Sequence, residues 1–541
     1  MPRESCAMRV VALWAGLWWF VLASPAAAVH QPPPAYGGTL VEGTIGEAAG
    51  LIPMITSDTA SSDVQGLIYN GLLKYDKDLN LVGDLARSWE VSPDGLSITF
   101  HLRRGVRWHD GRPFTSADAL FTYRFMVDPK TPTPYSGDYL KVAEAEAPDP
   151  YTFRVTYKEP FAPGLASWTL PQLPAHLLEG KDARTSPLNR RPVGTGPYRF
   201  QQWDPGNKIV LTYNPDYFEG RPYIDTVVFR LIPDSATLFL ELRSGGVDRM
   251  GLTALQYRRQ TDTPFFRRNF RKYRYLASAY TFLGWNLRDP RFRDLRVRRA
   301  LCYAIDKEEL IKGVLLGLGR VCTGPMKPGT YWYNPRVRRY PYDPARARRL
   351  LAQAGWRDSD GDGVLDKDGK PFAFTIITNQ GNPYRTNAGV IIQHRLAKVG
   401  IKVELRTIEW AAFIKEFINK GRFEAALLGW TITPDPDIYD VWHSSRARPG
   451  GLNFTRYQNP ELDRLLEAQR RTFDKARRKA IVDRIQAILA EDVPYAFLYV
   501  PDALPIVNAR FHGIKPAPAG IGYNFIRWYV PKERQGIKLV P

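Results

Sequence analysis

A short acidic run that contains glycine has the spacing of metal ligands. The first nine positions of a calcium-binding loop take oxygen ligands at positions 1, 3, 5, 7 and 9. Here these positions hold Asp358, Asp360, Asp362, the carbonyl group of Val364, and Asp366. The twelfth position is a glycine, where such loops need a bidentate glutamate. The run half-matches such a loop, so a metal-free acidic turn and a structural calcium ion are both open, and we expect no required cofactor.

Polar side chains that could hold a solute follow two predicted strands. Ligands in open α/β sheets bind beyond the carboxyl ends of the strands. An indole offers a flat apolar face, while amide, hydroxyl and carboxylate groups orient a ligand. We therefore expect a ligand pocket lined by Asn379, Gln380 and Asn382 after the first strand, and by Trp430, Thr433 and Asp435 after the second. For Trp430 the alternative is packing in the core.

Residues that commonly catalyse reactions do not form a catalytic pattern. None of the seven histidines belongs to an H-x-x-x-H pair, and there is no G-x-S-x-G sequence. The run from Gly194 to Gly196 lacks the lysine and hydroxyl residue of a phosphate-binding loop. His109 and Asp110 are neighbours, but they lie in a predicted turn of the scaffold. We predict that the protein is not an enzyme.

The N-terminus is typical of a secretion signal. Arg3 and Arg9 precede an apolar run at residues 10–23, which is short for a membrane span, and three alanines at residues 26–28 offer a cleavage site. Cys6 precedes the apolar run, so it is not placed for lipid attachment. We predict a signal peptide at residues 1–28 and a mature protein in the periplasm that is not a lipoprotein and has no stable membrane insertion.

Cys302 and Cys322 remain after removal of that segment. An oxidising compartment permits a disulfide, but spacing alone does not show whether two cysteines touch. A disulfide and two buried free thiols are both open.

The formal net charge of +20 would permit binding to nucleic acid. The basic residues are mostly arginines scattered along predicted helices, for example at residues 346–349 and 470–478. In a secreted protein this pattern favours a solvated surface, and we expect no nucleic-acid partner.

The elements that would position the polar strand ends lie at residues 372–428. Strands at 372–378, 401–406 and 424–428 alternate with helices at 388–398 and 410–420. Such alternation requires crossovers and predicts a parallel, doubly wound sheet. Because 541 residues exceed one ordinary core, we expect at least two lobes.

The stretch 84–127 has a different residue pattern. A turn at Ser92–Gly95 is followed by alternating apolar residues at 98–103 and by a second turn at 109–113. Thr115 is a good N-cap, and Asp118 completes a capping box. The stretch predicts a hairpin followed by a capped helix, which is scaffold.

This stretch resembles the extracellular solute-binding proteins of family 5, the peptide and nickel type of receptor for ABC importers. The matching residues are Ala86, Ser88, Trp89, Asp94, Gly95, Phe100, Leu102, Arg103, Gly105, 108–111, Pro113 and Asp118. Further family-like runs occur in order at residues 193–198, 214–225 and 294–306, so the resemblance covers nearly the whole mature chain.

The resemblance implies an α/β, two-lobe periplasmic-binding-protein fold of the class with an extra subdomain. Mixed sheets with flanking helices would enclose a cleft between the lobes. We expect lobe I at residues 29–283 and 497–541, with the extra subdomain at 76–193, and lobe II at residues 284–496.

The resemblance also implies an extracytoplasmic receptor, expected to be a monomer. It would capture a small solute, peptide or peptide-like, between its lobes and deliver it to the permease subunits of an ABC transporter. The alternatives are a ligand sensor or secreted chaperone of the same fold, or a hydrolase on that frame.

The ligand-binding segment departs from the family pattern. Peptide-binding members place an aspartate three residues after the tryptophan, where it holds a free amino group, and this chain has Thr433 there. Asp435 and Asp437 are the candidates to replace it, and Arg385 is a candidate for a carboxylate group by its proximity to Asn382.

In the family the polar loop before the first helix faces the ligand, so the resemblance implies the same place for this loop here. The residues concerned are Thr56, Ser57 and Asp58, and an ordinary polar loop is the alternative.

Overall fold

The computed structural model describes residues 33–536, apart from residues 57, 132, 134 and 450 and the side chains of residues 411 and 415. The predicted signal peptide and Ser57 lie outside the described residues. Within the described part, none of the helices combines the length and the apolar character that crossing a membrane requires.

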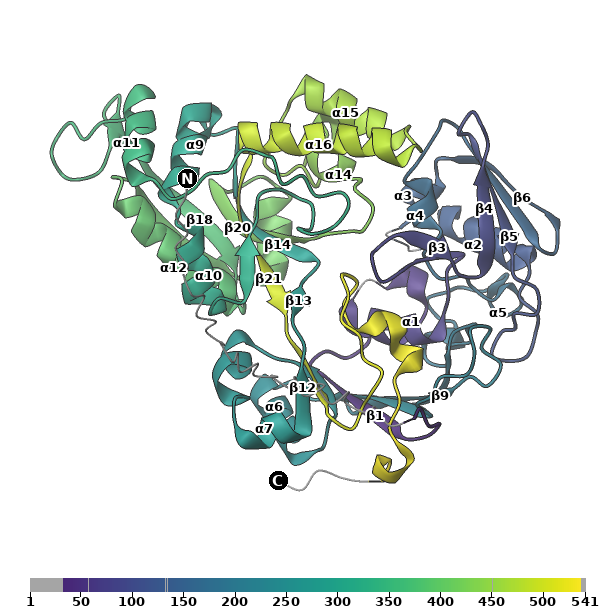
Figure 1. Cartoon of the computed structure of the whole chain (residues 1–541). Coiled ribbons are helices and arrows are strands. Elements are labelled where there is room, and N and C mark those ends of the chain that lie inside the picture. The colour runs from purple at the N-terminus through teal and green to yellow at the C-terminus, as the bar shows by residue number, and fades with distance from the viewer. Residues whose placement is uncertain (1–32, 57, 132, 134, 450, 537–541) are drawn as a thin grey trace, which may run out of the picture. The chain divides into compact units, whose positions relative to one another are not determined.

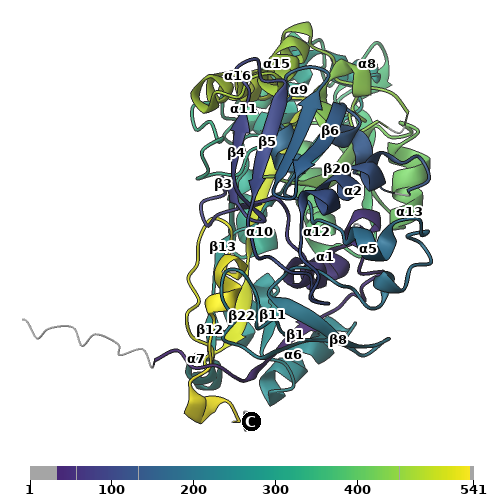
Figure 2. The same ribbon diagram turned by 90° about the vertical axis from the view of Figure 1, so that its right-hand side faces the viewer.

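The first lobe, residues 34–272 and 505–536, is built on a mixed sheet with the strand order β12-β22-β11-β1-β10-β9-β8. β1 runs parallel to β10 and β11, and the other neighbours are antiparallel. The strands are β1 (Thr39–Thr44), β8 (Tyr198–Asp204), β9 (Lys208–Tyr213), β10 (Thr226–Leu231), β11 (Arg249–Gly251), β12 (Phe270–Lys272) and β22 (Pro505–Asn508). Figure 2 shows β1, β8, β11, β12 and β22 of this sheet close together.

The second lobe, residues 275–503, has a sheet with the order β13-β21-β14-β20-β18-β19, and β15 adds to β21. β18 is parallel to both β19 and β20, which confirms the predicted parallel strands. The strands are β13 (Tyr275–Leu276), β14 (Ala279–Trp285), β15 (Gly319–Val321), β18 (Ala373–Asn379), β19 (Lys402–Ile408), β20 (Ala425–Thr431) and β21 (Tyr495–Ala503).

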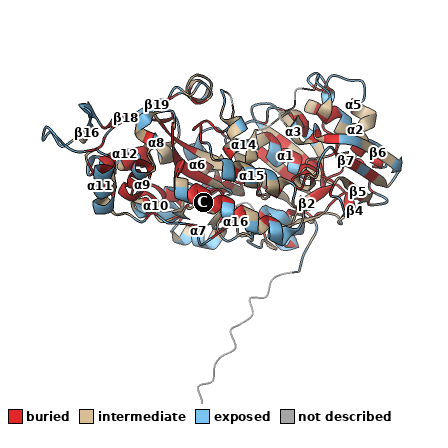
Figure 3. Cartoon of the chain, turned by 90° about the horizontal axis from the view of Figure 1, so that it is seen from above, coloured by how far each residue is buried: buried red, intermediate tan, exposed pale blue. Residues whose placement is uncertain are grey.

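Helices lie around this second sheet (Figure 1). They are α9 (Leu295–Ala304), α10 (Lys307–Leu315), α11 (Pro344–Gln353), α12 (Pro383–Ala397), α15 (Pro460–Arg470) and α16 (Lys475–Asp492). In α11, Asp343 caps the helix and Pro344 occupies the first turn, while Ala347 and Leu351 are buried. Figure 3 shows the same division, with buried residues along the strands and exposed residues on outer helix faces.

A four-stranded antiparallel sheet, ordered β4-β5-β7-β6, forms a subdomain of the first lobe. Its elements are β4 (Ala86–Val91), β5 (Ser97–Leu102), β6 (Val142–Asp149), β7 (Thr152–Tyr157) and α2 (Ser116–Val127). The predicted hairpin is confirmed, because β4 and β5 pair antiparallel. The predicted helix cap is also confirmed, because the Thr115 N–H donates to Asp118 Oδ2 at 3.0 Å. Phe100, Trp108 and Trp168 are buried in the core of this subdomain.

The chain changes sheet between β12 and β13 and again between β21 and β22. At the second-lobe end of these connections, Tyr275 and Leu276 of β13 pair with Ala503 and Asp502 of β21. The expected lobe borders, after residue 283 and before residue 497, fall inside β14 and β21 instead of between the sheets.

Shorter elements complete the described chain. They are η1 (Pro53–Ile55), α1 (Thr59–Ile68), β2 (Leu73–Tyr75), β3 (Leu81–Gly83), α3 (Ser136–Tyr139), α4 (Gly164–Ser167), α5 (Ala175–Leu178), η2 (Pro187–Asn189), α6 (Ser235–Ser244), η3 (Gln256–Gln260), α7 (Pro264–Asn269), α8 (Pro290–Arg293), β16 (Asp366–Lys367), β17 (Lys370–Pro371), α13 (Trp410–Ala412), η4 (Phe413–Ile418), α14 (Tyr439–Trp442), η5 (Ser444–Arg446), η6 (Gly522–Arg527) and η7 (Lys532–Arg534).

Candidate functional site

A cavity of about 250 Å³ has walls from both lobes, and we call it the interlobe cavity. The first lobe contributes residues of β2, β3 and the loop between them, together with Trp89, Ala162 and Leu165. The second lobe contributes residues from the segments 326–332, 432–435 and 473–478, and Ser278 from the connection between β13 and β14. A cavity of this construction is enclosed or exposed when two lobes close or open about a hinge.

The lobes touch at the edge of this cavity through the turn between α15 and α16. The N–H of Ala162 donates to the carbonyl oxygen of Arg470 at 2.6 Å. Lys475 Nζ donates to Asn80 Oδ1 at 2.9 Å, and Phe473 packs against the core of the subdomain. Through these non-covalent contacts the turn holds the second lobe against the subdomain of the first.

The segment that follows β20 is held by an ion pair. Asp435 accepts two hydrogen bonds from Arg478 of α16, at 2.8 and 2.7 Å, a bidentate geometry that is strong and directional. Arg478 is 7% exposed and Asp435 is 14% exposed at the side chain. The Thr433 hydroxyl donates to the carbonyl oxygen of Asp435 at 2.9 Å, which fixes the turn.

Asp437 has its own arginine partner. Its carboxylate accepts from Arg470 Nε at 2.8 Å and from Gln469 Nε2 at 2.7 Å. Both candidates for an amino-group anchor, Asp435 and Asp437, are thus already neutralised by arginines of α15 and α16. Neither one offers an uncompensated negative charge to a ligand.

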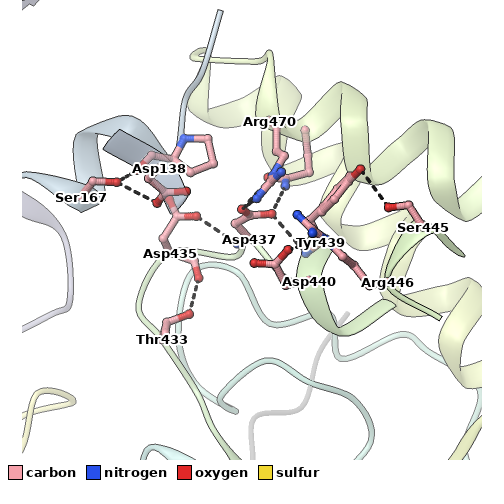
Figure 4. Close-up of polar contacts among 12 residues, drawn as sticks. Asp138, Ser167, Thr433, Asp435, Asp437, Tyr439, Asp440, Ser445, Arg446 and Arg470 are labelled. Atoms are coloured by element: carbon pink, nitrogen blue, oxygen red, sulfur yellow. Dashed lines mark hydrogen bonds and ion pairs between the residues drawn. The ribbon is translucent and has the colours of Figure 1, made fainter. Parts of the chain in front are cut away.

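A third carboxyl group approaches this segment from the first lobe. Figure 4 shows Asp138 of α3, hydrogen-bonded by the Ser167 hydroxyl at 2.8 Å, beside Asp437 and Arg470 of the second lobe. Burial raises the pKa of Asp138, and the negative charge of Asp437 raises it further. Arg470 is the positive charge that allows the two carboxyl groups to lie near each other.

A second cavity, of about 240 Å³, lies at the carboxyl ends of β18 and β20, and we call it the strand-end cavity. Asn382, Arg385 and Trp430 line it. Arg385 donates to Asn379 Oδ1 at 2.7 Å, and burial lowers the pKa of its guanidinium. Trp430 stacks on Phe282 with ring centroids 6.4 Å apart, so it contributes to the core as well as to the wall.

The predicted ligand residues are therefore divided. Thr433 and Asp435 line the interlobe cavity, while Asn382 and Trp430 line the strand-end cavity. Gln380 is exposed and lines neither cavity. The interlobe cavity is also lined by residues that no strand-end signal in the sequence marks, namely Tyr75, Lys327, Tyr331, Trp332 and Lys475.

Thr56 and Asp58 also line neither cavity. Asp58 is the N-cap of α1 and accepts from the N–H and the hydroxyl of Ser61 at 2.7 and 2.6 Å. The Thr56 hydroxyl accepts from Gln65 Nε2 at 2.7 Å. In the structure both side chains hold the local loop and the start of the helix.

Residues 80–450 match the family model of the bacterial extracellular solute-binding proteins, family 5. The chain belongs to this family. It is 35% identical over 509 residues to the oligopeptide-binding protein AppA of Bacillus subtilis, with 92% of this chain and 93% of AppA covered. The resemblance seen in residues 84–127 is confirmed.

Solved structures of family 5 proteins superpose on the chain. AppA of Bacillus subtilis in complex with a nonapeptide matches with a TM-score of 0.77 and 34% identity, over 92% of this chain and 100% of the other. NikZ of Campylobacter jejuni in complex with Ni(L-His) matches with a TM-score of 0.78 and 29% identity, over 91% and 99%. The predicted α/β periplasmic-binding-protein fold is confirmed.

The scaffold turn of this family 5 protein uses His109 as a structural group. The Gly194 N–H donates to His109 Nδ1 at 3.2 Å, so Nδ1 is unprotonated and Nε2 donates to the Gly196 carbonyl at 3.0 Å. Asp110 accepts instead from His176 Nε2 at 2.6 Å. Burial lowers the pKa of His109 to about 4. His109 and Asp110 therefore do not form a catalytic pair with each other.

The acidic run at residues 358–366 is partly assembled as a metal site would need. Ligand oxygens of Asp358, Asp360 and Asp362 all lie within 4.8 Å of one another on the surface. Asp366 instead accepts from the N–H and hydroxyl of Ser359, at 2.8 and 2.6 Å. Three hard oxygen donors fit calcium, while a complete loop would require Asp366 to turn towards the other three.

Cys302 and Cys322 are free, buried thiols in the structure and not a disulfide. Both line a third cavity, of about 320 Å³, together with Lys307. Cys322 Sγ donates to the Gly324 carbonyl oxygen at 3.1 Å. Burial raises the pKa of Cys302 to about 11 and that of Cys322 to about 12, which keeps both thiols protonated and weakly reactive.

Proposed function

We propose that this protein is an extracytoplasmic receptor that captures a small solute between its two lobes and delivers it to the permease subunits of an ABC transporter. The observation that carries the proposal is the interlobe cavity, whose walls come from both lobes of a family 5 fold. Closure of such lobes buries the solute and presents a changed surface to a partner.

The solute class is peptide or peptide-like. Among the relatives, AppA was solved with a nonapeptide and NikZ with Ni(L-His), so related frames hold amino-acid-derived ligands. The volume of about 250 Å³ is close to the lower end of the roughly 300–1,000 Å³ of small-molecule sites. Thr433 and Asp435 would contact the solute, and Asn382 and Trp430 would contact any part of it that extends to the strand ends.

The N-terminal features support the location. A charged start, an apolar run and small residues at 26–28 favour export and cleavage, and Cys6 is not placed for lipid attachment. We propose a monomeric periplasmic protein that has no catalytic activity and no nucleic-acid partner. The separate structural roles of His109 and Asp110 support the absence of catalysis.

Native mass spectrometry of the protein purified without added solute tests the receptor proposal. We expect a bound molecule of small mass that is released when the protein unfolds. The same molecule should bind again when it is added to the refolded protein. Tryptophan fluorescence should change on binding, because Trp89 and Trp332 line the interlobe cavity.

A variant with a blocked cavity tests the assignment, and a substitution outside the cavity is its control. Thr433→Trp places an indole in the interlobe cavity and should abolish binding, whereas Thr185→Trp, at an exposed residue that lines none of the three cavities, should bind normally. Equal binding by both variants would contradict the assignment of the cavity. Chemical conversion of the bound species would support an enzyme instead.

A further inference from the structure

The interlobe cavity has an unbalanced positive charge. Its charged lining residues are Asp78, Lys327, Asp435, Lys475 and Arg478. Asp435 is paired with Arg478, and Asp78 is paired with Lys77 at 2.5 Å. Within residues 33–536 as described, no carboxylate forms an ion pair with Lys327 or Lys475, so two ammonium groups remain without a compensating charge.

Lys327 is the more unusual of the two because it is only 6% exposed. Its ammonium donates to Ser278 Oγ at 3.2 Å and to the Pro518 carbonyl oxygen at 2.9 Å. An ammonium group has three protons, and both of these acceptors are neutral. A buried charge is costly unless it is paired, so an anion bound in the cavity would compensate this ammonium group. Burial accordingly lowers the pKa of Lys327.

Lys475 lines the same cavity and adds a second positive charge to it. Its ammonium donates to Asn80 Oδ1 at 2.9 Å and stands 4.5 Å from the centre of the Tyr331 ring. Both contacts are compatible with a positive charge, and neither one neutralises it. The cavity therefore combines two cations whose described partners are neutral with two carboxylates that are already paired with cations.

The other lining residues indicate that the body of the solute is flat and apolar. Aromatic side chains from both lobes face the cavity, namely Tyr75, Trp89, Tyr331, Trp332 and Phe473. Flat apolar walls with a few charged groups are typical of sites for small molecules that carry one polar end.

We propose that the interlobe cavity selects solutes that carry an oxyanion, a carboxylate or a phosphate, on an apolar or planar body, and that Lys327 pairs with this oxyanion with support from Lys475. The inference rests on the proposed receptor function and names the charge of its substrates. A free amino group is not needed, because Asp435 and Asp437 hold arginines instead.

The test compares matched probes by thermal shift and calorimetry at pH 7. The probes are N-acetyl-alanyl-phenylalanyl-alanine, its C-terminal amide, the same amide with a free amino group, phenyl phosphate and inorganic phosphate. We expect the acetylated acid or phenyl phosphate to bind at least about tenfold more tightly than the two amides. The preferred member of that pair identifies the oxyanion, and binding of inorganic phosphate alone would show that the aromatic walls are not used.

Variants separate charge from a structural role for Lys327. Lys327→Gln keeps a hydrogen-bond donor but loses the charge, and it should weaken binding of the acidic probe about tenfold or more. Lys327→Arg should restore most of the binding. Lys515→Gln, at an exposed lysine that does not line the cavity, is the matched control and should bind as the unaltered protein does.

The outcomes distinguish the two proposals. Equal binding of acid and amides, or full binding of the acid by Lys327→Gln, overturns the oxyanion inference and leaves the receptor function standing. If Lys327→Gln does not fold, Lys475→Gln must weaken binding of the acid relative to the amide, and an unchanged ratio overturns the inference. No binding of any probe, together with no solute retained on purification, counts against both proposals.

Discussion

In the strand-end cavity, Arg385 is held by Asn379 and Trp430 is stacked on Phe282, so the polar and aromatic residues there partner one another. In the interlobe cavity, Lys327 and Lys475 have only neutral partners among the described residues, while Asp435 is taken by Arg478. The first region is lined by residues of the second lobe alone, whereas the second is lined by residues of both lobes. Among the described residues, cations with only neutral partners line both cavities, and the interlobe cavity differs in having two of them, one of them the buried Lys327, between two lobes.

The largest effect should come from breaking the buried ion pair of the interlobe cavity. Arg478→Met leaves the largely buried carboxylate of Asp435 without its partner, and we expect the free energy of unfolding to fall by about 3–5 kcal/mol. Urea unfolding measures this. Asp435→Asn combined with Arg478→Met should recover part of the loss, and a double variant no better than the single one would contradict the pairing.

A smaller effect is expected at the strand ends. Trp430→Ala removes a half-buried indole that stacks on Phe282, and we expect a loss of about 2 kcal/mol in unfolding free energy together with weaker solute binding. Lys327→Gln should instead change affinity with a smaller change in stability. If Trp430→Ala lowers stability and leaves affinity unchanged, the strand-end cavity belongs to the frame alone.

A pH titration tests a residue that lines neither cavity. The pKa of His109 is lowered by burial to about 4, against about 6.5 in an unfolded chain. Protonation therefore favours the unfolded state, and stability falls as the pH drops from above 6.5 towards 4, by about 2 kcal/mol at pH 5. His109→Gln should flatten this dependence in urea unfolding measured between pH 8 and pH 4.5, and an equally steep curve would show that other groups cause it.

The smallest expected effect is that of calcium. If the carboxylates of Asp358, Asp360 and Asp362 bind the ion with a Kd of about 10⁻⁴ M, 1 mM calcium should stabilise the protein by about 1.4 kcal/mol. A chelator should lower the melting temperature correspondingly. Asp360→Asn should remove the response, and no shift on adding calcium or chelator would discard the site.

Much of the fold could be predicted because its signals are local. Alternation in residues 98–103, the capping box at Thr115 and Asp118, and the strand–helix alternation of residues 372–428 all depend on neighbours in the sequence. The lobe borders were misplaced inside β14 and β21, because a strand pattern does not reveal which sheet the strand joins.

Residue patterns alone identify the family, the parallel strands of the second lobe and the place of Thr433 where peptide-binding members have an aspartate. Only the tertiary structure decided that Asp435 and Asp437 are occupied by arginines, that Cys302 and Cys322 are free thiols, and that Lys327 lines the cavity between the lobes. The physical reason is that backbone patterns depend on residues a few positions apart. Whether a charge is paired depends on segments that only the folded chain brings together, here residues of the interlobe cavity separated by up to 395 positions, as for Lys475 and Asn80.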